Sequence, residues 1–244
     1  MRVVRSLGVW LGIGLSTTLF GIPAIFASFV PPRGDWFLLF ARGWARTILK
    51  FSGVRVAVRH PERLSQRGPF IVVANHESYA DVLVLLANLP MQVRFLAKRG
   101  IFRVPVLGWS IRAAGFVPVD RGDRSRSFAT VETALKRLGK GRSLVVFPEE
   151  TRTRNGELSP FKKGAAMLAS KTGFPILPVG IAGTRQVLPR GTWNAKRGRV
   201  VLCVGEPLAA DPSTHARKEM TARMKDSVAA LREEAAQELR RETL

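Results

Sequence analysis

The sequence predicts an α/β domain in which about seven strands form a central sheet flanked by helices. Short apolar runs rich in β-branched residues recur along the chain, and segments with helical periodicity separate them. This alternation is typical of layered α/β domains. The length of 244 residues is enough for one such domain with a substantial core and some additional elements.

The expected elements follow from these runs in order. We expect strands at 54–58, 70–74, 93–97, 116–119, 143–147, 176–182 and 199–204. We expect helices at 79–88, 104–113, 125–138, 162–172 and 216–240. Pro118 predicts that its strand lies at an edge of the sheet or ends there. The last helix mixes basic and acidic residues at short spacing, which predicts a solvated amphipathic helix without a functional role.

The N-terminal residues 1–52 form a separate motif in this interpretation, and residues 53–244 form the main domain. Residues 6–32 carry no charged side chain, and the apolar run 7–30 is long enough to cross a hydrocarbon core of ~30 Å. We expect an uncleaved membrane anchor here, although a signal peptide has similar features. Gly21 and Pro23 interrupt the run, so a crossing helix and a broken helix within one leaflet both remain open.

The segment that follows, 35–51, has a basic stripe opposite an aromatic face. Its basic residues recur every four positions, and its apolar residues lie on the other side: Arg42, Arg46 and Lys50 against Phe37, Phe40, Trp44, Ile48 and Phe51. This pattern predicts a helix lying in the interface of an anionic bilayer. The alternative is a helix docked on the core with a solvated basic face.

The charge balance points to an anionic partner. Lysine and arginine number 39 against 18 acidic residues, a formal net charge of +21. Nucleic acid, anionic lipid headgroups and an anionic substrate all fit this balance. The uncharged N-terminus favours lipid and argues against nucleic acid. The single cysteine, Cys203, excludes an intrachain disulfide, and the three histidines lack metal-ligand spacing, so no metal is expected.

The segment 75–81 is the strongest candidate for chemistry. It follows an apolar strand and contains Asn75, His76 and, five residues after the histidine, Asp81. A histidine with a nearby carboxylate is a candidate general base with its orienting acid. On a continuous helix five residues rotate by ~500°, so the two side chains would not share a face. They can meet if His76 precedes the helix and Asp81 lies in its first turns; the alternative is a satisfied histidine at a strand end.

Three further segments have features of the same kind. Segment 115–121 ends in Arg121, segment 147–152 reads Phe-Pro-Glu-Glu-Thr-Arg after a strand, and 176–181 is another apolar strand. With Asn75, His76 and Asp81, these segments resemble in order the four sequence blocks of the glycerolipid acyltransferases, specifically the 1-acylglycerol-3-phosphate acyltransferases. The resemblance runs from about residue 53 to about residue 207. It specifies the superfamily better than the acyl acceptor.

The resemblance implies a mixed central sheet and assigns roles to individual residues. It implies that His76 is the general base, that Asp81 orients it, and that substrate is bound by Arg121, Glu149, Thr151, Arg152, Lys162 and Lys98. Arg121 and Arg152 would hold the acceptor phosphate, since guanidinium groups suit phosphate. Glu149 would orient the acceptor or Arg152, with a structural bond to the loop backbone as the alternative.

The function implied is transfer of a fatty acyl group from acyl-CoA or acyl-carrier protein to the sn-2 hydroxyl of 1-acylglycerol-3-phosphate (lysophosphatidic acid), giving phosphatidic acid. The expected place is the cytosolic face of the inner membrane, with anionic lipids as partners, no nucleic acid, and no cofactor beyond the acyl thioester. His76 would deprotonate the hydroxyl as it attacks the thioester carbonyl. A covalent intermediate on Ser78 is an alternative to direct transfer.

Glu150 is the one departure from the family pattern, which usually has glycine there. Glutamate lacks the conformational freedom of glycine and adds negative charge beside the expected phosphate site. This keeps open another acceptor, either a different lysophospholipid or a lyso-aminolipid. Two further classes also remain open: a thioesterase, in which water replaces the acceptor, and a non-catalytic protein that binds anionic membranes.

Overall fold

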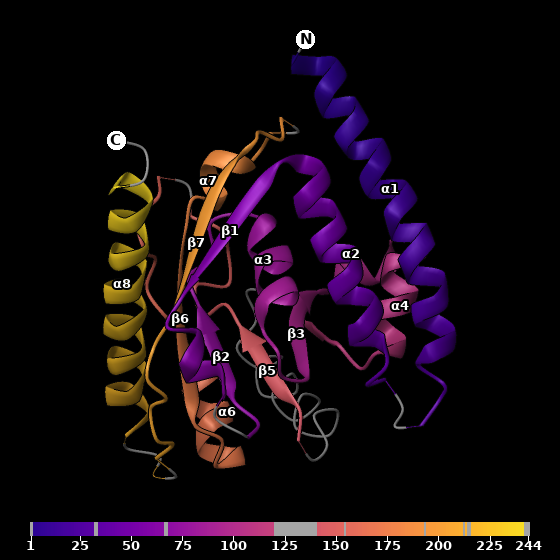
Figure 1. The fold of residues 1–244 in the computed structure, drawn as a ribbon. Coiled ribbons are helices and arrows are strands. Elements are labelled where there is room, and N and C mark those ends of the chain that lie inside the picture. The colour runs from indigo at the N-terminus through magenta and orange to yellow at the C-terminus, as the bar shows by residue number, and fades with distance from the viewer. Residues whose placement is uncertain are drawn as a thin grey trace.

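A seven-stranded sheet with helices on both faces forms the body of the protein (Figure 1). The computed structural model describes residues 2–31, 34–65, 68–119, 141–153, 155–192, 194–211, 213 and 216–241. The strands are β1 (Val54–Arg59), β2 (Ile71–Ala74), β3 (Val93–Lys98), β4 (Val117–Val119), β5 (Ser143–Val146), β6 (Ile176–Ala182) and β7 (Gly198–Val204). The α-helices are α1 (Arg2–Ala27), α2 (Phe37–Ser52), α3 (Ala80–Asn88), α4 (Leu107–Ala113), α6 (Gly164–Thr172), α7 (Thr184–Val187) and α8 (Arg217–Arg241), with 3₁₀ turns η1 (Pro61–Ser65) and η2 (Arg99–Arg103).

The sheet is mixed, as predicted. Its strand order is β1-β7-β6-β2-β5-β3-β4, and every neighbouring pair is parallel except β6 and β7. The carboxyl ends of β2, β3, β4, β5 and β6 therefore meet at one edge of the sheet. All seven strands begin and end within one residue of the predicted bounds, and β4, with Pro118, lies at the edge of the sheet. The predicted helix 125–138 lies outside the described residues.

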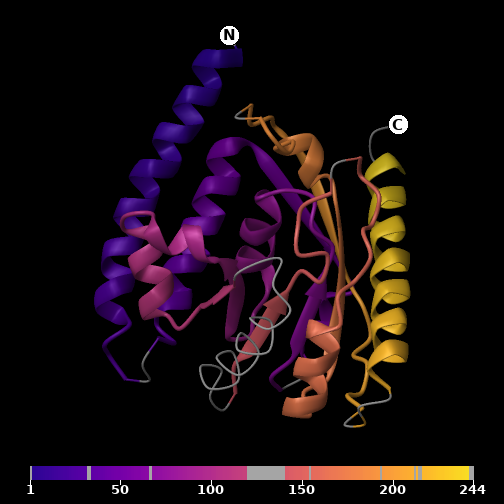
Figure 2. The same cartoon turned by 180° about the vertical axis from the view of Figure 1, so that it is seen from behind.

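Alternate strand residues face the two helical layers because side chains along a strand point to opposite sides. Val72, Val145 and Leu177 pack in one core with α2 and α3, whereas Ile71 and Leu144 pack in another with α6 and α8. Figure 2 shows the same division from behind, with α1, α2 and α4 on one side and α6 and α8 on the other. The apolar strands are thus covered on both faces, which explains their continuous hydrophobic runs.

The C-terminal helix is amphipathic, as predicted, but it is docked on the sheet. Helix α8 buries an apolar stripe against the sheet, formed by Met220, Met224, Val228, Leu231 and Ala235. It lies directly on β6 because Gly180 has no side chain: a Cβ atom there would be 2.3 Å from the backbone of Leu231 and of Arg232. Charged residues dominate the composition of this helix and obscure its narrow apolar stripe.

Helix α1 continues through Pro23 to Ala27, so the predicted interruption does not occur. The Ser28 hydroxyl donates to the Ala24 carbonyl at 2.7 Å and supports the last turn. Helices α1 and α2 pack against each other: a Cβ atom at Gly12 would meet the Phe51 ring, and one at Gly43 would meet the Phe20 ring. Trp44 Nε1 donates to Thr17 Oγ1 at 3.0 Å. The N-terminal helices therefore form a packed pair.

Helix α2 follows the core-docking alternative instead of the interfacial one. Of its predicted aromatic face, Phe37 and Ile48 are buried and only Phe51 is largely exposed. The Arg42 guanidinium donates to the carbonyls of residues 89–91, and Arg46 Nε donates to the Ala87 carbonyl at 3.2 Å. Burial, with a contribution from Arg46, lowers the pKa of Arg42. These two arginines cap the end of α3, where unpaired carbonyls attract cations.

A buried arginine fixes the turn between α1 and α2 to the sheet. The side chain of Arg94, on β3, is 1% exposed and donates to the carbonyls of Gly34 and Ala114 at 2.7 and 2.6 Å. Its Nη2 lies 3.1 Å from Asp35 Oδ1, which also accepts from Arg142 at 2.8 Å. Burial, followed by the nearby Arg142 charge, lowers the pKa of Arg94 to about 10. The α1–α2 pair is thus attached at its turn as well as along its length.

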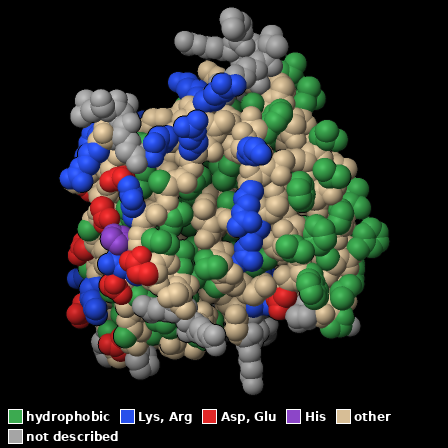
Figure 3. Space-filling model, viewed as in Figure 1, with side chains coloured by type: hydrophobic (Ala, Val, Ile, Leu, Met, Phe, Trp, Pro, Cys, Tyr) green, Lys and Arg blue, Asp and Glu red, His purple; other side chains and the backbone are tan. Residues whose placement is uncertain are grey.

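The outer side of α1 is an exposed apolar face. It comprises Leu7, Leu11, Leu15, Leu19, Ile22 and Phe26, each more than two-fifths exposed, and it occupies one side of the molecule (Figure 3). Among the described residues, α1 is the one helix long and apolar enough to cross a membrane. An exposed apolar area of this extent is typical of a membrane or protein contact.

Candidate active site

His76 and Asp81 meet in the way that the spacing requires. His76 lies in the loop between β2 and α3, and Asp81 lies in the first turn of α3. His76 Nδ1 is 2.8 Å from Asp81 Oδ2, and both side chains are almost fully buried. The bond to the carboxylate assigns the ring proton to Nδ1 and leaves Nε2 as the proton acceptor.

The Asp81 carboxylate also holds the backbone of the loop. Its Oδ2 atom accepts the backbone N–H groups of Glu77 and Ser78, both at 2.8 Å. The Asp81 side chain is 0% exposed, so these bonds replace the water lost at Oδ2, whereas the buried Oδ1 has no hydrogen-bond partner among the described residues. One oxygen atom therefore determines both the path of the loop and the orientation of the histidine.

The His76 ring is held from other directions by the loop that follows β5. The ring stacks on Phe147 with centroids 4.1 Å apart and planes inclined by 17°. The backbone N–H of His76 donates to Glu149 Oε1 at 2.7 Å, and its carbonyl accepts from the N–H of Thr153 at 3.0 Å. Parallel neighbours β2 and β5 place these two loops side by side.

Glu149 follows the structural alternative that the sequence left open. Its second oxygen, Oε2, accepts the N–H of Ser159 at 2.9 Å, so both carboxylate oxygens bond to backbone groups. Burial raises the pKa of Glu149, and these backbone bonds oppose the increase. Glu149 therefore ties the His76 loop to the segment that precedes α6.

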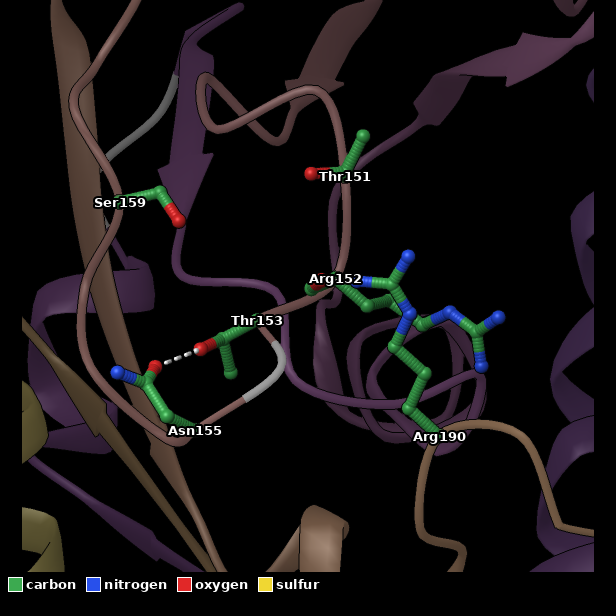
Figure 4. Close-up of a pocket in the computed structure, with 6 residues that line it drawn as sticks. All are labelled: Thr151, Arg152, Thr153, Asn155, Ser159 and Arg190. Carbon is green, nitrogen blue, oxygen red and sulfur yellow. Dashed lines mark hydrogen bonds between the residues drawn. The ribbon is translucent and has the colours of Figure 1, made fainter.

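A pocket of about 500 Å³ adjoins this loop and contains two arginines (Figure 4). Its lining residues are Thr151, Arg152, Thr153, Asn155, Ser159 and Arg190. The Arg152 guanidinium lies 3.7 Å from the centroid of the Tyr79 ring. Arg190 donates to the Arg152 carbonyl, and Figure 4 shows the two side chains next to each other. Because no acidic residue lines it, the pocket suits an anion.

Sequence reasoning missed Arg190. It follows Pro189 in the loop between α7 and β7, away from any strand end, and nothing near it in the sequence indicates a site. The topology carries a usable signal: α7 and the loop after it follow the carboxyl end of β6, which lies beside the end of β2 that precedes His76.

The other predicted substrate residues have different positions relative to the pocket. Thr151 lines the pocket, as does Arg152. Lys98 at the end of β3 and Lys162 before α6 are exposed and do not line it. Arg121 lies outside the described residues. Within the described part of the chain, no three histidine, cysteine, aspartate or glutamate side chains converge as metal ligands.

Ser78 has a structural position that does not suit a covalent mechanism. Its side chain is fully buried, and its hydroxyl donates to the Leu188 carbonyl at 2.8 Å. The same oxygen accepts the N–H of Ala80 at 3.1 Å. These bonds secure the start of α3 and occupy the hydroxyl proton that a general base would remove.

Glu150 adopts the backbone conformation for which glycine is suited. Its φ angle is +60°, in the left-handed region that is unfavourable for residues with a side chain. The expectation that glutamate would remove this conformation is therefore wrong. Glu150 is absent from the residues that line the pocket.

The comparisons with known proteins agree with this geometry. A family model described as Acyltransferase matches residues 55–182. The chain is 40% identical over 141 residues to "1-acyl-sn-glycerol-3-phosphate acyltransferase BAT2, chloroplastic" of Brassica napus, covering 57% of this chain and 41% of that protein. It is 33% identical over 182 residues to the LPAT1 enzyme of the same description from Arabidopsis thaliana, covering 74% and 51%. The chain thus spans about half the length of these curated relatives.

A solved structure extends the likeness over nearly the whole chain. The crystal structure of the 1-acyl-sn-glycerophosphate (LPA) acyltransferase PlsC from Thermotoga maritima matches with a TM-score of 0.76 and 30% sequence identity. The match covers 95% of this chain and 98% of that one, so it includes the N-terminal helices as well as the sheet.

We predict that Glu150→Gly stabilises the protein by about 1 kcal/mol relative to Glu150→Ala, because glycine relieves the left-handed strain that alanine retains. Both variants remove the charge, so the difference between them isolates the backbone effect. Chemical unfolding in detergent would measure it. Equal stability of the two variants would contradict the prediction, because the strain relieved by glycine would then be no larger than the entropy that glycine adds to the unfolded chain.

Proposed function

The chain belongs to the acyltransferase family, and from this premise we propose that it transfers a fatty acyl group from acyl-CoA or acyl-carrier protein to the sn-2 hydroxyl of 1-acylglycerol-3-phosphate, giving phosphatidic acid. The observation that carries the proposal is the His76–Asp81 pair beside a pocket with two arginines. An acceptor hydroxyl and its phosphate require this combination of a base and a cationic site.

His76 acts as the general base in the proposed mechanism. Its Nε2 removes the proton of the acceptor hydroxyl while the oxygen attacks the thioester carbonyl, and the histidine then protonates the thiolate that leaves. Asp81 keeps the proton on Nδ1 and stabilises the imidazolium that forms. Since the Ser78 hydroxyl donates to the Leu188 carbonyl, the acyl group in this proposal passes directly to the acceptor. The reaction as proposed needs no metal and no cofactor beyond the acyl thioester.

Arg152 and Arg190 bind the acceptor phosphate in this proposal. Both line the pocket, and the stacking of Arg152 on Tyr79 leaves the edge of its guanidinium available for phosphate oxygens. Glu150 is not a reason to prefer another acceptor in this proposal, because it adopts the left-handed backbone conformation and does not line the pocket. Arg121 remains a proposed ligand on the family pattern alone.

The protein is proposed to act at the cytosolic face of the inner membrane, in contact with anionic lipids. Residues 1–52 form the anchoring motif and residues 53–244 the catalytic domain. The exposed apolar face of α1 supplies the main support. Burying one leucine side chain is worth about 2 kcal/mol, so several outweigh a few screened surface charges. Because α2 packs into the core of the sheet, point substitutions test this anchor better than deletion of the motif.

We predict that His76→Ala abolishes acyl transfer without unfolding the protein, and that Asp81→Asn lowers the rate by roughly 10²- to 10⁴-fold, because each removes general-base assistance. Ser78→Ala is expected to retain a rate far above that of His76→Ala. The assay follows acyl-CoA consumption with and without lysophosphatidic acid, which separates transfer from hydrolysis. Near-normal turnover by His76→Ala would contradict the mechanism, and acceptor-independent turnover would indicate a thioesterase.

We predict that Arg152→Ala and Arg190→Ala each raise KM for lysophosphatidic acid roughly tenfold or more while KM for acyl-CoA stays within twofold, because each removes a charge-assisted bond worth about 2 kcal/mol. Arg223→Ala is the matched control, since Arg223 is an exposed arginine of α8 that does not line the pocket. An unchanged acceptor KM in both arginine variants would place the phosphate elsewhere.

We predict that replacing Leu11, Leu15 and Leu19 together by glutamine sharply weakens binding to anionic liposomes, because it removes apolar burial of about 2 kcal/mol per side chain. The same three positions replaced by isoleucine form the control, which keeps the face apolar. Flotation at low and high salt measures the partition. Release of the unaltered protein by salt alone would indicate a purely electrostatic attachment.

A further inference from the structure

Arg232, on α8, contacts two loops of the active site at once. Its Nε donates to Glu77 Oε1 at 2.7 Å, and its Nη2 donates to the carbonyl of Gly156. Glu77 is the residue after His76, and Gly156 belongs to the segment that lines the pocket. A planar guanidinium with donors in fixed directions is suited to hold two acceptors at a set separation.

The pair with Glu77 is largely shielded from water. The Glu77 side chain is 7% exposed and that of Arg232 is 29% exposed. Glu77 also donates its backbone N–H to Asp81 Oδ2, so the residue lies within the network that orients His76. Losing one partner of a shielded ion pair leaves the other charge uncompensated, and the effect is much larger than for a surface pair.

The contact of Arg232 with Gly156 secures a segment that lines the pocket. The carbonyl of Asn155 accepts from Arg185 of α7 at 2.6 Å, and the next carbonyl, that of Gly156, accepts from Arg232. The backbone N–H of Thr153, three residues earlier, donates to the His76 carbonyl. Residues 153–156 are thus held by arginines of α7 and α8 and by the backbone of His76.

The close packing at Gly180 brings Arg232 to this position. The missing side chain lets α8 touch β6 at Leu231 and Arg232, next to the strand that carries His76 at its end. The helix is also fixed by the buried residues Met224 and Val228. Arg232 therefore reaches the two loops from a helix that is firmly packed on the sheet.

We infer that Arg232 is a positioning residue for the transfer reaction, which through Glu77 and Gly156 keeps the His76 loop and the acceptor pocket in the relative arrangement that catalysis requires. The inference rests on the proposed function. Arg232 touches neither the reacting atoms nor His76; it acts through the two loops. A displacement of about 1 Å between a base and its substrate lowers a rate by up to about 100-fold.

The principal test compares Arg232→Met with Arg240→Met in the full-length protein. Arg240 lies on the same helix but forms an exposed pair with Glu233, so its loss controls for charge and for α8 stability. We expect Arg232→Met to lower kcat roughly 10- to 100-fold and to raise KM for lysophosphatidic acid, with KM for acyl-CoA unchanged. Arg240→Met should match the unaltered protein in all three.

A pH profile separates positioning from a loss of packing. Glu77 faces Arg232 of α8, Arg185 of α7 and Asp81 of α3; burial raises its pKa, and the Arg232 bond opposes the increase. In Arg232→Met the pKa of Glu77 rises further. The carboxyl is then neutral below that pKa, and above it is a buried charge without its hydrogen-bonded partner, so the rate deficit should grow as pH increases. Adding Glu77→Gln should remove this pH dependence while leaving a constant deficit, because the tie to Gly156 is still absent.

The outcomes are distinguishable from failure of the proposed function, because the unaltered protein is assayed first for transfer to lysophosphatidic acid. Given that activity, folded Arg232→Met with unaltered kcat and acceptor KM would overturn the inference. If Arg232→Met does not fold, Arg232→Lys takes its place: it retains the charge but cannot serve both acceptors in the same geometry. We expect an intermediate loss, and full activity of Arg232→Lys would overturn the inference equally.

Discussion

The site depends on one buried oxygen atom, Asp81 Oδ2, which accepts three N–H groups at 2.8 Å. Three donors replace water at this oxygen, and the five-residue spacing supplies them from the histidine ring and from the backbone between the two residues. The same bonds begin α3, direct His76 and fix its tautomer. Local chain geometry and proton chemistry are therefore set by a single interaction.

Long-range bonds make this local arrangement rigid. Asn75 exchanges two hydrogen bonds with the backbone of Ile181, Glu149 accepts from the backbone of His76, and Thr153 donates to it. These partners come from β6 and from the loop after β5, the two neighbours of β2 in the sheet. The parallel order of these strands brings the loops that follow them to one edge of the sheet. Each of these hydrogen bonds involves at least one backbone group.

The sequence predicted what depends on local pattern and missed what depends on distant contacts. Apolar runs located all seven strands, and the spacing of His76 and Asp81 gave the geometry of their contact. Arg190 lies in a loop and Arg232 in a helix, both far along the chain from His76. Short-range sequence patterns do not predict such long-range contacts. The aromatic face of α2 was misassigned for a related reason: a face that packs on neighbouring helices and one that enters a bilayer have the same residues.

The buried Arg94 has a consequence for how the molecule meets a lipid surface. By holding the carbonyl of Gly34 and the carboxylate of Asp35, it ties the described part of the turn between α1 and α2 to β3. The angle between the apolar face of α1 and the loop of His76 is then decided during folding. Attachment through that face would order few additional torsions, so little conformational entropy would be lost on binding. The distance between His76 and the apolar face of α1 is then a fixed property of the fold.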